Sequence, residues 1–266
     1  MLNYEFMRNA LIVSALISVL SPCIGIFLVL RRFSMIGDTL AHASLAGITL
    51  SLATGRNPVL GAFAFTALCG GLVELLRAYF RKNADLILSI VLALSVGVAI
   101  TLISSGRFFR ANVDGFIFGS ILTVTRRDVI VVLALCLTSI LTLIFLYHQL
   151  IYIAFDEDAA KIAGIRVRLI NYVFMVLTAA AISVSIRIAG VLVLSSMITL
   201  PVATALQLGR GFRATLVFSI FFSFICIILG LVLSYYIGVA PGGFTALVSV
   251  AVLILVITAK RYSKLF

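Results

Sequence analysis

The sequence predicts an all-α, polytopic membrane protein with eight or nine transmembrane helices, in which residues 1–266 form a single transmembrane domain. Of the 266 residues, 63% are hydrophobic and only 11% are charged, and the mean hydropathy is +1.28. Soluble domains carry about 25% charged residues, so this composition excludes that class. Continuous apolar runs such as residues 129–146 are too long for the strands of a membrane β-barrel, which leaves helices.

The apolar blocks give the bounds of the expected spans. Each block has about 20 residues, the length of a helix that crosses the hydrocarbon core, and short polar breaks separate the blocks. The expected spans are residues 9–30, 36–54, 58–80, 86–105, 128–148, 168–186, 189–208, 214–237 and 243–259. The segment 106–127 is too polar for a lipid-facing helix and too apolar for a free loop. It is interpreted as a re-entrant or interfacial piece buried by other helices, which leaves eight and nine spans both open.

The net charge of +11 comes from Lys and Arg residues that cluster at the ends of the apolar blocks. The pairs Arg31–Arg32 and Arg81–Lys82 fit the cytoplasmic ends of spans, because cytoplasmic loops carry an excess of positive charge. No run of residues resembles a nucleic-acid patch, so the expected surroundings are a lipid bilayer without a nucleic-acid partner. The isolated cysteines, with no CxxC pair, argue against a disulfide framework or a thiolate metal site.

Asp38 and His42 are ionisable residues inside an expected span. Residues four apart lie on one face of a helix, so the carboxylate and the imidazole point toward the same place. Ionisable residues within a membrane usually face a bundle interior or a water-filled path, and these two groups together suit a divalent cation. The alternative is a capping or packing pair near the cytoplasmic end of the span, in which Asp38 offsets Arg31 or Arg32. The metal-site hypothesis is preferred.

The segment 155–165 has the pattern of a short helix outside the membrane: a capping Asp, acidic residues in the first turn, alanines behind them, and a Gly where a helix ends. In importers driven by a separate motor, such a helix docks on the ATPase. A well-capped loop helix without a partner is equally compatible with the local pattern. The candidate coupling residues are Phe155, Asp156, Glu157, Ala159, Ala160 and Gly164.

The expected span 189–208 combines hydroxyl side chains with a proline, which removes a backbone hydrogen bond near its middle. Freed carbonyls and hydroxyls would line a polar path through the membrane. Alternatively, the hydroxyls bond back to their own helix and the proline only kinks the span for packing. The path-lining interpretation is preferred. The candidate pathway residues are Ser195, Thr199, Pro201 and Thr204.

Four motifs occur in a fixed order along the chain. The first is residues 31–47, Arg-Arg-Phe-Ser-Met-Ile-Gly-Asp-Thr-Leu-Ala-His-Ala-Ser-Leu-Ala-Gly. Residues 118–122 and 155–164 follow, and then residues 190–194 together with 200–205. In this order, and over nearly the whole chain, they resemble the membrane permease subunits of bacterial zinc, manganese and iron ABC importers.

The resemblance implies a metal-uptake permease that works as a homodimer and crosses the bacterial inner membrane many times. Such a permease takes a metal ion from an extracytoplasmic binding protein and passes it inward, powered by ATP on two copies of a cytoplasmic ATP-binding subunit. The sequence contains no G-x-x-x-x-G-K-[ST] phosphate loop, so the chain is expected to be a transport subunit and not an enzyme. No permanently bound cofactor is expected.

In that family the acid and histidine of the first motif are thought to meet the metal, which assigns this role to Asp38 and His42. A two-fold axis would bring together up to four ligands, the number zinc prefers. The first motif resembles the zinc branch, since Ala46 stands where the manganese branch tends to carry Pro. Zinc is therefore the preferred substrate, with manganese or iron as alternatives. A second hypothesis is a proton-coupled carrier in which Asp38 and His42 relay protons without any ATPase.

Overall fold

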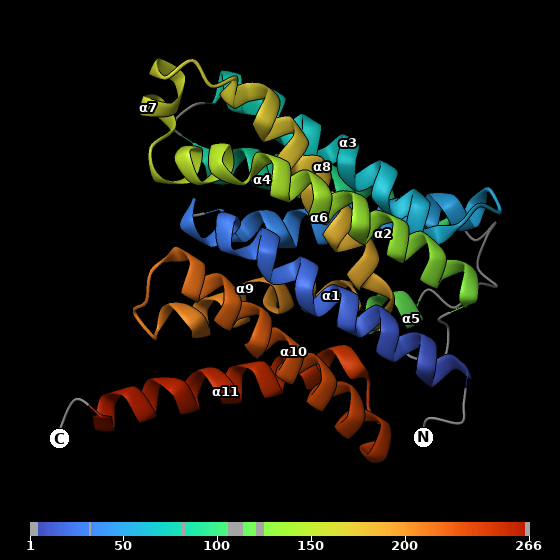
Figure 1. The fold of residues 1–266 in the computed structure, drawn as a ribbon. Coiled ribbons are helices and arrows are strands. Elements are labelled where there is room, and N and C mark those ends of the chain that lie inside the picture. Colours follow the sequence, from blue (N-terminus) through green and yellow to red (C-terminus); the bar gives the residue numbers. More distant parts are fainter. Residues whose placement is uncertain (1–4, 32, 81–82, 106–113, 121–124, 264–266) are drawn as a thin grey trace.

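The structure, a computed structural model, describes residues 5–31, 33–80, 83–105, 114–120 and 125–263. These residues form helices and contain no strand, which confirms the all-α prediction (Figure 1). The first helices are α1 (Glu5–Leu30), α2 (Ser34–Ala53), α3 (Pro58–Tyr79), α4 (Ala84–Ser104) and α5 (Asp114–Ile117). The others are α6 (Arg126–Phe155), α7 (Glu157–Ile162), α8 (Val167–Ala189), the 3-10 turn η1 (Val191–Val193), α9 (Leu194–Leu206), α10 (Phe212–Ile237) and α11 (Pro241–Ser263).

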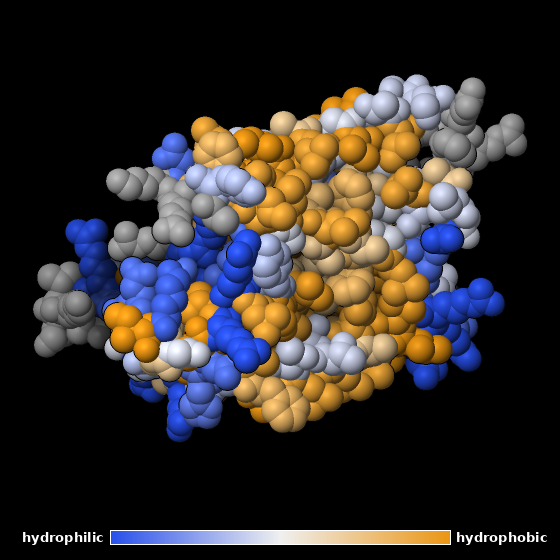
Figure 2. All heavy atoms as spheres, turned by 90° about the horizontal axis from the view of Figure 1, so that it is seen from above, coloured by the Kyte–Doolittle hydropathy of each residue, from blue (hydrophilic) through white to orange (hydrophobic). Residues whose placement is uncertain are grey.

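Among the described residues, seven helices are long and apolar enough to cross a membrane: α1, α3, α4, α6, α8, α10 and α11. Figure 2 shows a hydrophobic belt between two hydrophilic ends, as expected for a multi-pass membrane protein. The 20-residue α2 is not one of the seven, because Asp38, His42 and several hydroxyl-bearing residues lower its hydropathy. The start of α1 and the end of α11 lie at opposite ends of the bundle (Figure 1).

The helix α2 lies inside the bundle, where it contacts α3, α4, α8 and α9. Its closest approach is to α3. A Cβ atom added at Gly47 would overlap the carbonyl oxygen of Gly61, and one added at Gly61 would overlap the side chain of Ser51. Small residues of this kind let two membrane helices pack backbone against backbone. The glycines therefore fix α2 against α3 and leave little freedom for α2 to shift sideways.

The helix α6 is longer than the predicted span 128–148 and continues to Phe155. The polar residues His148 and Gln149 stand where the predicted span ends. The helix continues beyond them because Leu150 and Ile153 are buried against the core. No Gly or Pro interrupts the helix, and it ends where Asp156 adopts an extended conformation. Tertiary burial therefore outweighs the local polar signal at His148.

The predicted span 189–208 is not one continuous helix. Gly190, at φ +74°, ends α8, and the chain continues through η1 into the 13-residue α9. At 1.5 Å per residue α9 is about 20 Å long, shorter than the hydrocarbon core of about 30 Å. Gly190 lies against the backbone of Gly119, so a side chain would fit at neither position.

Residues 114–120 of the predicted re-entrant segment pack at this break, whereas its last residues, 125–127, form the N-cap and first turn of α6. The helix α5 contacts α8 and η1, and Phe116 is buried. Gly242, at the start of α11, closes the same region because a Cβ there would overlap the carbonyl of Ala189. Residues 106–113 and 121–124 of the predicted segment lie outside the described residues.

Candidate functional site

One stripe of α2 remains partly accessible. From Ile36 to Thr49 every residue is buried except Asp38, His42 and Leu45, which are half-buried. Spacings of four and three residues place these side chains on one face of the helix. Neighbouring helices cover the rest of this part of α2. The two candidate metal-ligating side chains therefore share the accessible stripe of an otherwise buried helix segment.

Asp38 is held by a residue from another candidate motif. The Ser195 hydroxyl, in the first turn of α9, donates a hydrogen bond to Asp38 Oδ1 at 2.7 Å. Gly37 permits this approach of the two helices, because a Cβ at Gly37 would lie only 3.3 Å from Ser195 Cβ. Hydrogen bonds to an ionised carboxylate are stronger than neutral ones, so Ser195 orients Asp38. Within the described part of the chain, the second carboxylate oxygen, Oδ2, has no hydrogen-bond partner.

The other predicted pathway residues lie differently from Ser195. The Thr199 hydroxyl donates to the Ser195 carbonyl at 2.9 Å, and the Thr204 hydroxyl donates to the Leu200 carbonyl at 2.8 Å. Both bonds stay within α9, as the alternative interpretation of this span expects. Pro201 and Thr204 are buried inside the protomer. A pathway role for these three residues stays a prediction, and Ser195 is the member that contacts the α2 pair.

The predicted helix outside the apolar spans is present as α7. Asp156 caps it, since its side chain accepts hydrogen bonds from the backbone N–H groups of Asp158 at 3.0 Å and Ala159 at 2.9 Å. Gly164 follows the helix at φ +79°. Phe155 belongs to the end of α6 and not to α7, and its side chain is 70% exposed. The predicted cap and stop are confirmed, and the helix itself is shorter than the predicted segment.

Glu157 points toward the bundle and not away from it. Its carboxylate lies 2.9 Å from Arg77 Nη2, 3.8 Å from Arg31 Nη2 and 3.2 Å from Lys161 Nζ. Arg77 is in the last turn of α3, and Arg31 directly follows α1. Arg31 lies at the end of an apolar span, as predicted, but its side chain is only 4% exposed and pairs inside the bundle.

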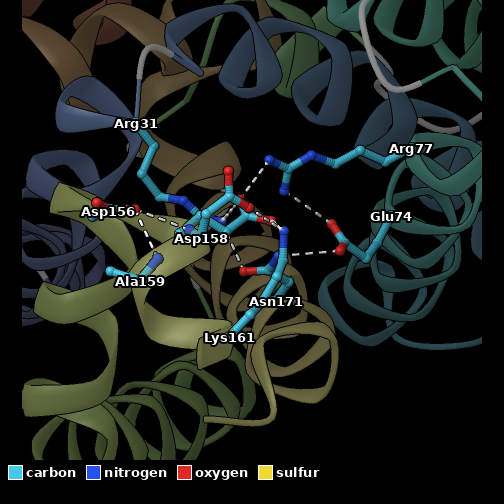
Figure 3. A network of polar contacts seen from close by, with 9 residues as sticks. Arg31, Glu74, Arg77, Asp156, Asp158, Ala159, Lys161 and Asn171 are labelled. Atoms are coloured by element: carbon cyan, nitrogen blue, oxygen red, sulfur yellow. Dashed lines mark hydrogen bonds and ion pairs between the residues drawn. The ribbon is translucent and has the colours of Figure 1, made fainter. Parts of the chain in front are cut away.

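Asn171 of α8 lies among these charged side chains and links Arg31 to a further charge, Glu74 (Figure 3). It accepts a hydrogen bond from Arg31 at 2.7 Å and donates one to Glu74 Oε1 at 3.1 Å. We call this set the ionic cluster; its members are Arg31, Glu74, Arg77, Glu157 and Asn171. The sequence indicates part of this cluster, because Glu74 and Arg77 stand three residues apart, and so on one helix face, in an otherwise apolar span.

The charged groups of the cluster shift the pKa values of Arg31 and Glu157. Burial, together with the neighbouring Arg77, lowers the pKa of Arg31 to about 10, although Glu157 and Glu74 oppose this change. Burial raises the pKa of Glu157, but Arg77, Lys161 and Arg31 outweigh it, so the net pKa lies below its ordinary value. Arg31 and Glu157 are therefore both ionised near neutral pH.

Comparison with known proteins identifies the group to which this chain is similar. The ABC 3 transport family matches residues 3–260. A probable metal transport system membrane protein of Treponema pallidum is 56% identical over 264 residues, 99% of each chain. The high-affinity zinc uptake system membrane protein ZnuB of Haemophilus influenzae is 26% identical, over 90% of this chain and 92% of its own. The manganese import system permease protein ScaB of Streptococcus parasanguinis is 28% identical, over 93% and 88%.

The fold has a solved counterpart. The structure of PsaBC from Streptococcus pneumoniae in complex with Fab matches with a TM-score of 0.86 at 26% identity, covering 98% of this chain and 95% of that chain. The helical frame, the four ordered motifs and a family match over nearly the whole length agree with one another. The chain therefore belongs to the ABC 3 transport family, as a permease of the metal-transporting kind.

Proposed function

We propose that this chain is the permease subunit of an ABC importer for zinc and that Asp38 and His42 bind the ion during passage. The observation that carries the proposal is the shared accessible stripe of α2, on which both side chains lie. A carboxylate oxygen and a neutral imidazole nitrogen suit zinc, and the absence of thiolate ligands fits a site that must release its ion. Ser195 supports the site by orienting Asp38.

We propose further that a second copy of the chain completes the site. Within the described ranges, no group of three or more His, Cys, Asp or Glu side chains is placed to hold a metal ion. One protomer thus offers the pair Asp38 and His42, whereas zinc in proteins commonly has four ligands. A two-fold axis along the pathway would supply the second pair from an identical surface.

The motor and the metal receptor are proposed to be other chains, an ATP-binding subunit in two copies and an extracytoplasmic metal-binding protein. The sequence has no phosphate-binding loop of the ATPase type. The side chain of Ile162 on α7 is 89% exposed and that of Phe155 is 70% exposed, at the end of the molecule where α7 lies. Exposed apolar side chains of this kind are typical of docking surfaces, which supports α7 as the contact for the ATP-binding subunit.

Transport by the reconstituted system tests the function. Vesicles that contain the chain with its ATP-binding subunit, binding protein and ATP are expected to import zinc, and omission of any component should abolish import. Asp38→Ala and His42→Ala should reduce uptake at least tenfold, because each removes a ligand. Leu45→Ala is the matched control, since Leu45 shares the accessible stripe but cannot bind a metal. Import by the chain alone, driven by a proton gradient, would instead establish the carrier hypothesis.

Manganese is the second candidate substrate, because the relative ScaB is named for manganese import at 28% identity. Uptake of Zn²⁺, Mn²⁺ and Fe²⁺ at matched free concentrations separates the candidates. Preferred uptake of zinc is expected. Faster uptake of manganese would overturn the zinc assignment and leave the metal-permease assignment in place.

A further inference from the structure

The helix α7 is held to the bundle by very few side chains. Within α7 the buried residue is Ala160, and its single methyl group buries little apolar surface, so it contributes little to the attachment of the helix. Asp158, Lys161 and Ile162 are exposed. The side chain of Glu157 links α7 to the long helices of the bundle. It forms ion pairs with Arg77 of α3 and with Arg31, which follows α1. The ionic cluster therefore contributes to holding α7 against the bundle.

Arg77 lies between two carboxylates in this cluster. It pairs with Glu157 of α7 at 2.9 Å through Nη2, while Nη1 lies 3.6 Å from Glu74 Oε2 on its own helix. At 3.6 Å the second contact is too long for a hydrogen bond. Within the described residues, Arg77 Nη1 and Glu74 Oε2 are both buried without a hydrogen-bond partner. Arg77 and Glu74 thus form an ion pair without a hydrogen bond between these two atoms.

Space for a rearrangement adjoins these groups. A cavity of about 720 Å³ is lined by Glu74, Arg77, Glu157 and Asn171, among others. If α7 moved outward, Arg77 would lose Glu157 but could close the short gap to Glu74. Its charge would remain paired in both positions, which avoids the large cost of an unpaired buried charge.

The cluster also contacts the start of the helix that carries the metal-site candidates. The guanidinium groups of Arg77 and Arg31 lie 4.8 Å and 5.5 Å from the ring centre of Phe33. Both distances lie within the range of cation–π contacts, so both cations interact with the ring. Phe33 is the N-cap residue of α2, and Asp38 follows five residues later. Continuous contacts therefore join α7 to the beginning of α2.

We propose that Arg77 exchanges between Glu157 and Glu74 as α7 moves, and that this exchange couples the position of α7 to α2. Arg77 and Glu74 are positioning residues in this scheme, since they act on the metal site through Phe33. The inference rests on the proposed function, because it takes α7 to be the helix that the ATP-binding subunit moves. It adds the residues through which that movement reaches Asp38.

The test compares two substitutions within the cluster with one outside it. Glu157→Gln removes the partner of Arg77 on α7, and Glu74→Gln removes the alternative partner on α3. Asp158→Asn is the matched control: it removes the same charge from the first turn of α7, but its side chain is 89% exposed and contacts Lys161. The measurement is metal imported per ATP hydrolysed by the complete reconstituted transporter. Both cluster variants should lower this ratio by about fivefold or more while ATP hydrolysis persists, whereas Asp158→Asn should not.

A second measurement does not depend on the partners. Hydrogen exchange of the purified chain in detergent should show faster exchange of the α7 amides in Glu157→Gln, with α8 and the Asp158→Asn control unchanged. This measurement decides the matter if Glu157→Gln fails to assemble with the ATP-binding subunit, and unaltered α7 exchange would then overturn the inference. Unchanged import per ATP in both cluster variants would overturn it too, while leaving the proposed function intact. Failure of the wild-type complex to import any metal would instead reject the proposed function.

Discussion

At the scale of residues, the carboxylates of Asp38 and Glu157 have different surroundings, which suit different roles. Asp38 accepts a hydrogen bond from Ser195 through Oδ1 and, among the described residues, has no partner for Oδ2, which suits an ion-binding group on the same helix face as His42. Glu157 is surrounded by the cations Arg77, Lys161 and Arg31, which suits a structural group. The sequence places one acid in an apolar span and the other in a capped loop helix, but it does not show these partners.

The Ser195 hydrogen bond predicts a selective effect on metal binding. Ser195→Ala should raise the metal concentration at half-maximal uptake by about tenfold, because a hydrogen bond to a charged group contributes about 1.5–3 kcal/mol. Ser196→Ala is the control, since its hydroxyl bonds to the Val193 carbonyl within the same segment. Equal behaviour of the two variants in a metal-uptake titration would show that Ser195 does not orient Asp38.

The lowered pKa of Glu157 predicts how the attachment of α7 depends on pH. Because the pKa is lower in the folded chain, the stabilisation is fully present above the ordinary carboxyl value of 4.5 and is lost as pH falls through the lowered value. Hydrogen exchange of α7, corrected for the intrinsic effect of pH, should therefore accelerate only in acid below about pH 4.5. Glu157→Gln should show no such transition, and a transition of the same size in this variant would assign the effect to another group.

At the scale of elements, the break between α8 and α9 is set by close backbone contact. Gly190 combines a positive φ with packing against Gly119 and Phe118, so both conformation and space require glycine there. The break makes α9 a short helix whose first turn presents Ser195 to Asp38. In a continuous helix over 189–208, Ser195 would point in a different direction relative to α2.

Substitution of glycine at this break tests its role. Gly190→Ala should lower the melting temperature of the chain clearly more than Gly209→Ala. Both glycines have positive φ, +74° and +65°, so both substitutions incur strain of about 1–3 kcal/mol. Only at Gly190 does the added Cβ also overlap backbone atoms, whereas at Gly209 the nearest atom is Lys260 Nζ at 3.9 Å. Thermal unfolding in detergent measures the difference, and equal losses would show that the contact with Gly119 is dispensable.

At the scale of the whole molecule, a continuous set of contacts joins two candidate functional regions, the ionic cluster with α7 and the Asp38–His42 pair of α2. The helix α7 lies at one end of the bundle (Figure 1). Its ionic cluster contacts Phe33 at the beginning of α2, the helix that carries Asp38 and His42. In the proposed dimer, the accessible stripe of α2 faces the same stripe of the second copy. Shape and charge at this scale thus suit a subunit that works within a larger assembly.

The dimer proposal predicts the behaviour of mixed complexes. When wild-type chain is co-expressed with His42→Ala, mixed dimers should import metal more slowly than wild-type dimers, because the shared site loses one of its four ligands. Tagging each copy differently allows mixed complexes to be purified before reconstitution. Uptake by mixed complexes at half the wild-type rate with unchanged metal affinity would indicate that each copy carries its own independent site.

The sequence by itself determined the features that depend on neighbours along the chain. Apolar length specifies most of the spanning helices, and the cap at Asp156 and the stop at Gly164 specify α7, because hydropathy and capping act over a few residues. Spacing alone places Asp38 and His42 on one face. The order of the four motifs indicates the family, because the motifs are distributed over nearly the whole chain.

Only the tertiary structure decided what these residues contact. A charge at the end of an apolar block looks the same in the sequence whether it meets water or, like Arg31, pairs with Glu157 far along the chain. The bond from Ser195 to Asp38 joins residues 157 positions apart, and the break at Gly190 depends on Gly119. Such contacts arise when distant helices pack, and no local pattern encodes which distant partner a polar side chain will meet.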